Sequence, residues 1–206
     1  MSGAGRTDTA TAWYVPIARA VPALAFAVVI AFTADHSAAL GLLALGVVAL
    51  LTGAIITASA IRQDEHGVPR TILIAQGLVT IAAGIAALAL VNGGLPYLVF
   101  LLTTWAAIAG FLELYLGLRS RGRSRSARDR VFVGSLTALL ALVVLLVPPG
   151  FVQAFTGPDG VERQLTASVI VVGTLGAYWA IAGVYLVIAG LSIKWDAGLP
   201  TTVSEA

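Results

Sequence analysis

Apolar residues in this chain form long stretches, and short polar segments separate one stretch from the next. Because the hydrocarbon core of a bilayer is about 30 Å thick, a helix needs about 20 apolar residues to cross it. Residues 71–112 carry no charge, and as one helix they would be about 63 Å long, so the turn at residues 92–96 is predicted to divide them. The pattern predicts six transmembrane helices, at residues 14–33, 38–61, 71–90, 95–118, 131–147 and 165–193.

Small residues recur at a fixed interval along successive predicted helices. In the first, third and fifth helices the series starts 57 residues apart, at Ala20, Gly77 and Gly134. In the second and fourth helices Gly53 and Gly110 are also 57 residues apart, and Gly183 of the sixth follows after 73, because residues 148–164 form a longer loop. Three parallel two-helix units, at about 14–62, 71–119 and 131–193, are therefore predicted around an axis along the membrane normal.

These small residues have a packing explanation. Lipid tails are as apolar as leucine, so membrane helices associate where small side chains let their backbones approach closely. The predicted fold is thus an all-α integral membrane bundle, and a pore lining is the alternative use of the same residues. The glycines expected at helix–helix contacts are Gly53, Gly77, Gly84, Gly110, Gly117, Gly134, Gly183 and Gly190.

Positive charge is distributed unevenly between the two ends of the predicted helices. Eleven of the twelve Lys and Arg residues lie on the side of the N-terminus, and only Arg163 lies on the other side. Since cytoplasmic loops are enriched in Lys and Arg, both termini are predicted to be cytoplasmic, as tails at residues 1–13 and 194–206. No cleavable signal peptide is predicted, so the first helix is expected to be retained.

Composition narrows the function classes. Only 11% of the residues are charged, where soluble domains have about 25%. The chain has no cysteine, which excludes disulfides and thiolate metal sites, and its near balance of 12 basic and 10 acidic residues predicts no nucleic-acid partner. No nucleotide-binding loop, hydrolase elbow or zinc-protease motif occurs, so neither catalytic residues nor a metal or cofactor are expected.

One polar layer inside the bundle is a candidate site. Glu113 is the one acidic residue within a predicted helix, and Arg19 and Gln76 occupy equivalent repeat positions at a similar depth. A carboxylate inside a membrane is a functional candidate, so we expect these three side chains to lie together near the cytoplasmic face. The layer is either a static ion pair that fixes helix register or a site where Glu113 binds and releases protons.

Two loops carry further candidate residues. An arginine-rich loop is expected to anchor the topology or to bind anionic lipid headgroups, through Arg119, Arg121, Arg123, Arg125, Arg128 and Arg130. The loop 148–164 is expected outside the cell, and its length in an otherwise economical repeat suggests a binding role for a protein partner. Its candidate residues are Phe151, Phe155, Asp159, Glu162 and Arg163.

The fourth predicted helix carries a family resemblance. Its segment WAAIAGFLELYLGLR at residues 105–119, echoed by WAIAG at residues 179–183, resembles the HdeD-like family of small bacterial inner-membrane proteins linked to acid resistance. That family consists of repeated two-helix units, and the resemblance covers most of residues 14–193, apart from the loop 148–164 and the arginine-rich loop. It implies a non-enzymatic role in envelope stress, through partners or lipids. A small-solute or proton-linked transporter is the alternative function, and the oligomeric state stays open.

Overall fold

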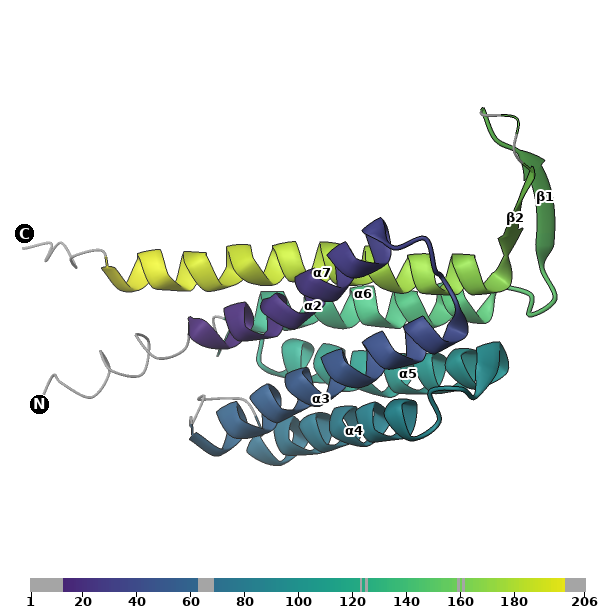
Figure 1. The fold of residues 1–206 in the computed structure, drawn as a ribbon. Coiled ribbons are helices and arrows are strands. Elements are labelled where there is room, and N and C mark those ends of the chain that lie inside the picture. Colours follow the sequence, from purple (N-terminus) through teal and green to yellow (C-terminus); the bar gives the residue numbers. More distant parts are fainter. Residues whose placement is uncertain are drawn as a thin grey trace, which may run out of the picture.

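The computed structural model describes residues 13–62, 69–122, 124, 126–158, 160 and 162–198. Most of this part of the chain is helical, as α2 (Tyr14–Phe32), α3 (Ala38–Arg62), α4 (Arg70–Ala89), α5 (Gly94–Arg119), α6 (Ala127–Leu145) and α7 (Ala167–Gly198). Two strands, β1 (Val152–Thr156) and β2 (Glu162–Thr166), form an antiparallel hairpin between α6 and α7. The helices lie side by side in one bundle, with the hairpin at one end and the start of α2 at the other (Figure 1).

Five of the described helices are long and apolar enough to cross a membrane, namely α2, α3, α4, α5 and α7. The first four predicted spans agree with α2 to α5 to within one residue at each end. The predicted break also occurs, because residues 90–93 form a turn and Gly94 has a φ of 77°, which favours glycine. The chain therefore has the all-helical core of a multi-pass membrane protein.

The boundaries of α6 differ from the prediction. The helix begins at Ala127 instead of residue 131 and ends at Leu145 instead of residue 147. Its first turn therefore includes the charged residues 128–130, which the sequence pattern assigned to the loop. The first turn of a helix is held by backbone hydrogen bonds within the helix, so α6 can begin with charged residues that precede the apolar stretch detected by hydropathy.

The segment 148–164, expected to be a long loop, contains most of a β-hairpin that the sequence analysis did not predict. Its two strands pair in register from Val152 opposite Thr166 to Thr156 opposite Glu162. Residues 165 and 166 consequently belong to β2, and α7 begins two residues later than predicted, at Ala167. The β-branched residues at both ends of the pairing favour extended backbone, which explains the strands.

The helices form a closed ring in which close and looser contacts alternate. The most extensive contacts join α3 to α4, α5 to α6 and α2 to α7. Three pairs of helices that follow each other in the chain share fewer contacts, namely α2 and α3, α4 and α5, and α6 and α7. The first and last helices of the described chain are thus direct neighbours, and α2 and α5 lie on opposite sides of the ring.

Glycine makes the close contacts possible. A Cβ atom added at Gly53 would lie 2.8 Å from the carbonyl oxygen of Gly77, and one added at Gly110 would lie 2.8 Å from the backbone nitrogen of Ala138. No side chain fits at these distances, so the helix backbones touch where the side chain is missing. Seven of the glycines expected from the sequence lie at such contacts, and Gly183 lies instead against the Leu24 side chain; the seven are Gly53, Gly77, Gly84, Gly110, Gly117, Gly134 and Gly190.

The half of the bundle near the hairpin has an entirely apolar core. At this end α3, α5 and α7 begin and α6 ends (Figure 1). The side chains in this core are packed without solvent exposure, and they are Leu42, Leu45, Leu98, Leu102, Val144, Val171, Val172 and Leu175. Such packing excludes water, so this half closes the bundle toward the hairpin.

We predict that Gly110→Ala destabilises the protein, because the added methyl group pushes α5 away from α6. Overpacking of this kind costs about 1–3 kcal/mol, which thermal unfolding in detergent measures. Gly173→Ala is the matched control, since no atom lies within 4 Å of a Cβ placed there. The control should unfold at or slightly above the wild-type temperature, because alanine favours a helix over glycine. Equal unfolding midpoints for the two variants would contradict this account of the α5–α6 contact.

Candidate functional site

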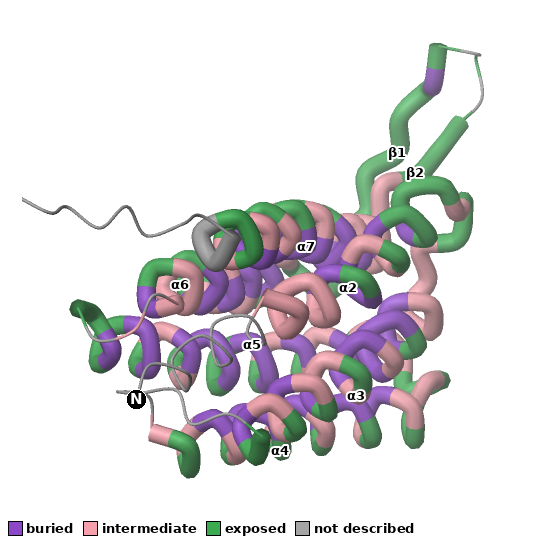
Figure 2. The backbone as a smooth tube through the Cα atoms, turned by 90° about the vertical axis from the view of Figure 1, so that its left-hand side faces the viewer, coloured by how far each residue is buried: buried purple, intermediate pink, exposed green. Residues whose placement is uncertain are grey.

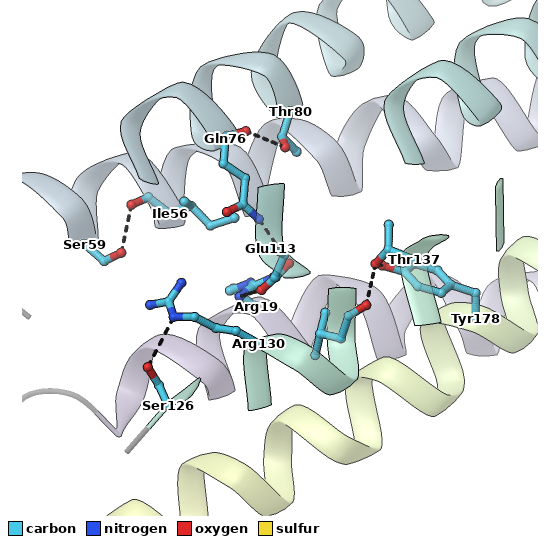
Figure 3. A network of polar contacts seen from close by, with 11 residues as sticks. Arg19, Ile56, Ser59, Gln76, Thr80, Glu113, Ser126, Arg130, Thr137 and Tyr178 are labelled. Atoms are coloured by element: carbon cyan, nitrogen blue, oxygen red, sulfur yellow. Dashed lines mark hydrogen bonds and ion pairs between the residues drawn. The ribbon is translucent and has the colours of Figure 1, made fainter. Parts of the chain in front are cut away.

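Three polar side chains from three helices meet inside the bundle (Figure 3). Arg19 of α2 donates two hydrogen bonds to Glu113 of α5, from Nη1 to Oε1 at 3.1 Å and from Nη2 to Oε2 at 3.3 Å. Gln76 of α4 donates a third, from Nε2 to Oε2 of Glu113 at 3.0 Å. The structure therefore brings together the polar layer expected from the sequence, with Glu113 at its centre.

Burial makes this network costly to break. Glu113 is 4% exposed and Gln76 2%, while the Arg19 side chain keeps 14% of its surface exposed. A single charge in the middle of a membrane helix costs roughly 2.5–3.5 kcal/mol on insertion scales. The two-pronged contact between Arg19 and Glu113 is the strongest geometry for this pair and offsets part of that cost. Because α2 and α5 lie on opposite sides of the ring, the ion pair also ties the bundle together across its middle.

Other hydrogen-bonded side chains extend the polar centre toward the middle of the bundle. Trp105 Nε1 donates to Thr80 Oγ1 at 3.4 Å, and Thr80 Oγ1 donates to the backbone oxygen of Gln76 at 2.8 Å. Thr137 Oγ1 donates to the backbone carbonyl four residues earlier at 2.8 Å, which uses its single proton. Tyr178, whose Oη lies 2.8 Å from the same Oγ1, is therefore the donor in that contact.

These four residues were not part of the site expected from the sequence. Trp105 was named only as the first residue of the segment that resembles the HdeD-like family, and no role was expected for Thr80, Thr137 or Tyr178. The repeat interval carries the missing information, since Trp105 and Tyr178 are 73 residues apart, as Gly110 and Gly183 are. Equivalent repeat positions thus identify the polar side chains that share one level of the bundle.

A cavity of about 50 Å³, here called the central cavity, lies between these side chains. Fifteen of its lining residues fall into five sets whose members are related by the intervals of 57 and 73 residues, so equivalent positions from all three predicted units converge on it. Each set contributes one residue from each unit, and the sets are Arg19, Gln76 and Val133; Ala23, Thr80 and Thr137; Val48, Trp105 and Tyr178; Thr52, Ala109 and Ala182; and Ile56, Glu113 and Leu186. Two of its lining residues carry a polar atom that is buried without a hydrogen-bond partner among the described residues, namely Arg19 Nε and Gln76 Oε1.

The arginine-rich loop lies apart from the polar centre, at the end of the bundle where α2 begins (Figure 1). The structure describes Arg119, Arg121, Arg128 and Arg130, whereas Arg123 and Arg125 lie outside the described residues. Arg119 donates to the Tyr115 hydroxyl at 3.2 Å and stacks over its ring, and Arg128 is exposed. Arg121 is exposed as well, as residues are that meet water or lipid headgroups, whereas Arg130 is half-buried and donates from Nε to the Ser126 hydroxyl at 3.2 Å.

The expected partner loop forms a separate surface at the opposite end. Every residue of β1 is exposed, and so are three of the five residues of β2 (Figure 2). Phe155 is 47% exposed, while Glu162 and Arg163 are exposed beside it and Phe151 is half-buried at the base of the hairpin. Asp159 lies outside the described residues. None of the described hairpin residues reaches the polar centre.

Within the described ranges, no group of three or more His, Asp and Glu residues could hold a metal ion. The acidic and histidine residues at 64–66 lie outside these ranges. Comparisons of the chain with protein-family models, with curated proteins and with solved structures give no match. The site is therefore described by its own geometry, as a neutral, buried Arg–Glu–Gln network beside a small cavity.

We predict that Arg19 and Glu113 are energetically coupled. Glu113→Gln and Arg19→Gln should each lower the unfolding temperature in detergent, because each leaves a buried charge without its counter-charge. The double variant should recover part of the loss, with a coupling energy of about 0.5–3 kcal/mol. As a matched control, Arg128→Gln combined with Glu113→Gln should give additive losses, since Arg128 is exposed. Additive losses in the Arg19 cycle as well would contradict the pairing.

Proposed function

We propose that this chain is a non-enzymatic protein of the bacterial inner membrane, an accessory protein in envelope stress or acid tolerance that acts through a partner or through lipids. The hairpin of β1 and β2 is the observation that carries the proposal, because it extends beyond the helix bundle with most of its residues exposed (Figure 2). A projecting, apolar-containing element on a closed bundle suits binding better than catalysis. The resemblance of residues 105–119 to the HdeD-like family supports the same role.

The closed interior supports an accessory role over the transport of organic solutes. The central cavity of about 50 Å³ has room for about three to five water molecules, which is less than a metabolite occupies. Toward the hairpin the apolar core blocks any path between the described helices. A transporter of this size would be expected to have broken helices and a larger polar site near the middle of the membrane.

We also propose that all six described helices cross the membrane as three parallel two-helix units. α6 has 19 residues, so at about 1.5 Å per residue it matches a hydrocarbon core of about 30 Å. Close and looser helix contacts alternate three times around the ring, as a pseudo-threefold arrangement requires. The sets of equivalent positions around the central cavity support the same arrangement.

Both ends of the chain are proposed to be cytoplasmic, because the order of helices and loops along the sequence assigns eleven of the twelve basic residues to the same side as the two termini. The absence of cysteine allows a direct test by single cysteine substitution. Ala154→Cys in the exposed strand β1 should react with a membrane-impermeant thiol reagent in intact cells, and Ser126→Cys in the arginine-rich loop should react only after the membrane is opened. Labelling of the cysteine at 126 in intact cells would reverse the orientation.

The hairpin is predicted to bind an extracytoplasmic protein partner. Replacing residues 152–166 by a short glycine-serine turn should leave expression and the unfolding temperature unchanged, because the hairpin contributes little to the helix core, and should abolish co-purification of the partner. Phe155→Ala should weaken co-purification, whereas Phe100→Ala, which removes a similarly exposed phenyl ring from α5, should not. Retained co-purification after the replacement would contradict a docking role.

A proton-linked transporter is the second candidate, and the polar centre beside the central cavity is the observation that favours it. The two functions make different predictions for Glu113→Gln in cells. If the ion pair is structural, loss of acid tolerance should follow loss of folded protein in the membrane. If Glu113 carries protons, the variant should lose acid tolerance while its amount and unfolding temperature stay near those of the wild type, and that result would favour the transporter.

A further inference from the structure

Residues that line the central cavity carry an unused hydrogen-bond donor and an unused hydrogen-bond acceptor. Arg19 Nε is a donor and Gln76 Oε1 is an acceptor, and neither has a partner among the described residues although both are buried. The Tyr178 hydroxyl gives its proton to Thr137, so its oxygen keeps lone pairs that can accept. Buried polar groups in folded proteins are almost always hydrogen-bonded, so these atoms indicate a ligand that both donates and accepts.

The charges around the cavity select the class of that ligand. Arg19 is already neutralised by the two-pronged contact with Glu113, so an added anion would gain no free counter-charge and would meet the Gln76 oxygen. An apolar molecule would leave the donor and the acceptor unsatisfied. A small neutral molecule with both functions satisfies each atom, and a water molecule is the smallest of this kind.

Size agrees with the chemistry. A site for one water requires about 10–15 Å³ by the measure that gives this cavity about 50 Å³, so there is room for about three to five molecules. Each buried water needs two to four polar partners, and the polar residues that line the cavity include Arg19, Gln76, Tyr178 and Thr52. The apolar core toward the hairpin offers no polar partner for water. Along the bundle, the polar cavity is therefore followed by a region that water cannot occupy.

We infer that the central cavity is a binding site for a cluster of about three to five water molecules, which hydrate the Arg19–Glu113 pair inside the membrane and are sealed off from the hairpin end. Arg19 is the most exposed member of the layer and lies about 8 Å along α2 from its first residue, so exchange with solvent occurs from the end of the bundle that carries the arginine-rich loop. This inference concerns the interior of the bundle and is independent of any partner at the hairpin.

Solid-state NMR of the full chain in liposomes tests it by measuring the transfer of polarisation from water protons to isotope-labelled side chains. Arg19 Nε and the Gln76 side-chain amide should receive polarisation several-fold faster than the backbone amides of Leu98 and Leu102 in the apolar core. Equal and slow transfer at all four sites would show a dry cavity and overturn the inference. Fast transfer to Leu98 and Leu102 would show that water reaches the apolar core, and would contradict the inference that the cavity is closed toward the hairpin.

A cavity-filling variant gives a second, independent measurement. Ala109→Leu places three additional carbon atoms against the cavity, so it should slow the transfer to Arg19 Nε and Gln76 to the rate of the apolar core. Ala107→Leu on the exposed face of the same helix is the matched control and should leave the transfer unchanged. Unchanged transfer in a folded Ala109→Leu protein would place the water elsewhere and contradict the site. If Ala109→Leu does not fold, the inference is tested by the wild-type protein alone, through the transfer rates at Arg19 and Gln76 relative to those at Leu98 and Leu102.

Discussion

Close backbone contact at small residues is the constraint on which the rest of this structure depends. Helices in lipid gain little from hiding apolar side chains from one another, since the surrounding chains are equally apolar. Van der Waals contact then depends on how near two backbones can come, and Gly53 against Gly77 and Gly110 against Ala138 bring them to the limit. The same contacts fix which helices are neighbours, and that order decides which side chains face the centre of the ring.

The ring places the polar centre where it can serve the whole bundle. Because α2 and α5 lie opposite each other, the Arg19–Glu113 pair spans the interior and joins helices that the close contacts leave separate. Gln76 of α4 completes the carboxylate's hydrogen bonds with a neutral donor, so the network adds no net charge to the membrane interior. A polar network in this position specifies one arrangement of the ring, since a helix turned about its axis would bury an unpaired charge.

The sequence predicted what depends on local pattern. Hydropathy predicted the bounds of α2 to α5 to within one residue, and the glycine-rich turn before Pro96 predicted the break between α4 and α5. The similar depth of Arg19 and Glu113 in their helices predicted that the two side chains pair. The hairpin was missed because each strand is only five residues long, and alternation over so short a run is weak against a background of loop residues. The start of α6 was missed because charged residues can occupy the first turn of a helix without belonging to its apolar stretch.

The remaining features of the site depend on three-dimensional packing, which no local pattern encodes. Small residues occur on helices within a unit and between units, so their spacing alone does not say which pairs approach closely. The role of Tyr178 follows only from its contact with Thr137. The two residues are 41 positions apart in the chain and lie on α7 and α6, which are neighbours in the ring. Side-chain reach and the direction in which each proton points are set after the helices have packed.

The contact between α2 and α7 has a consequence for how the protein is made. Synthesis proceeds from the N-terminus, so α2 is made before the other described helices and its closest neighbour, α7, is made after them. During translation of the intervening helices the face of α2 that carries Ala20 stays in contact with lipid, and Arg19 has no counter-charge until Glu113 has been inserted. Closure of the ring is thus a late event in biogenesis, and a chain that stops before α7 is left as an open arc whose first helix has no stable place.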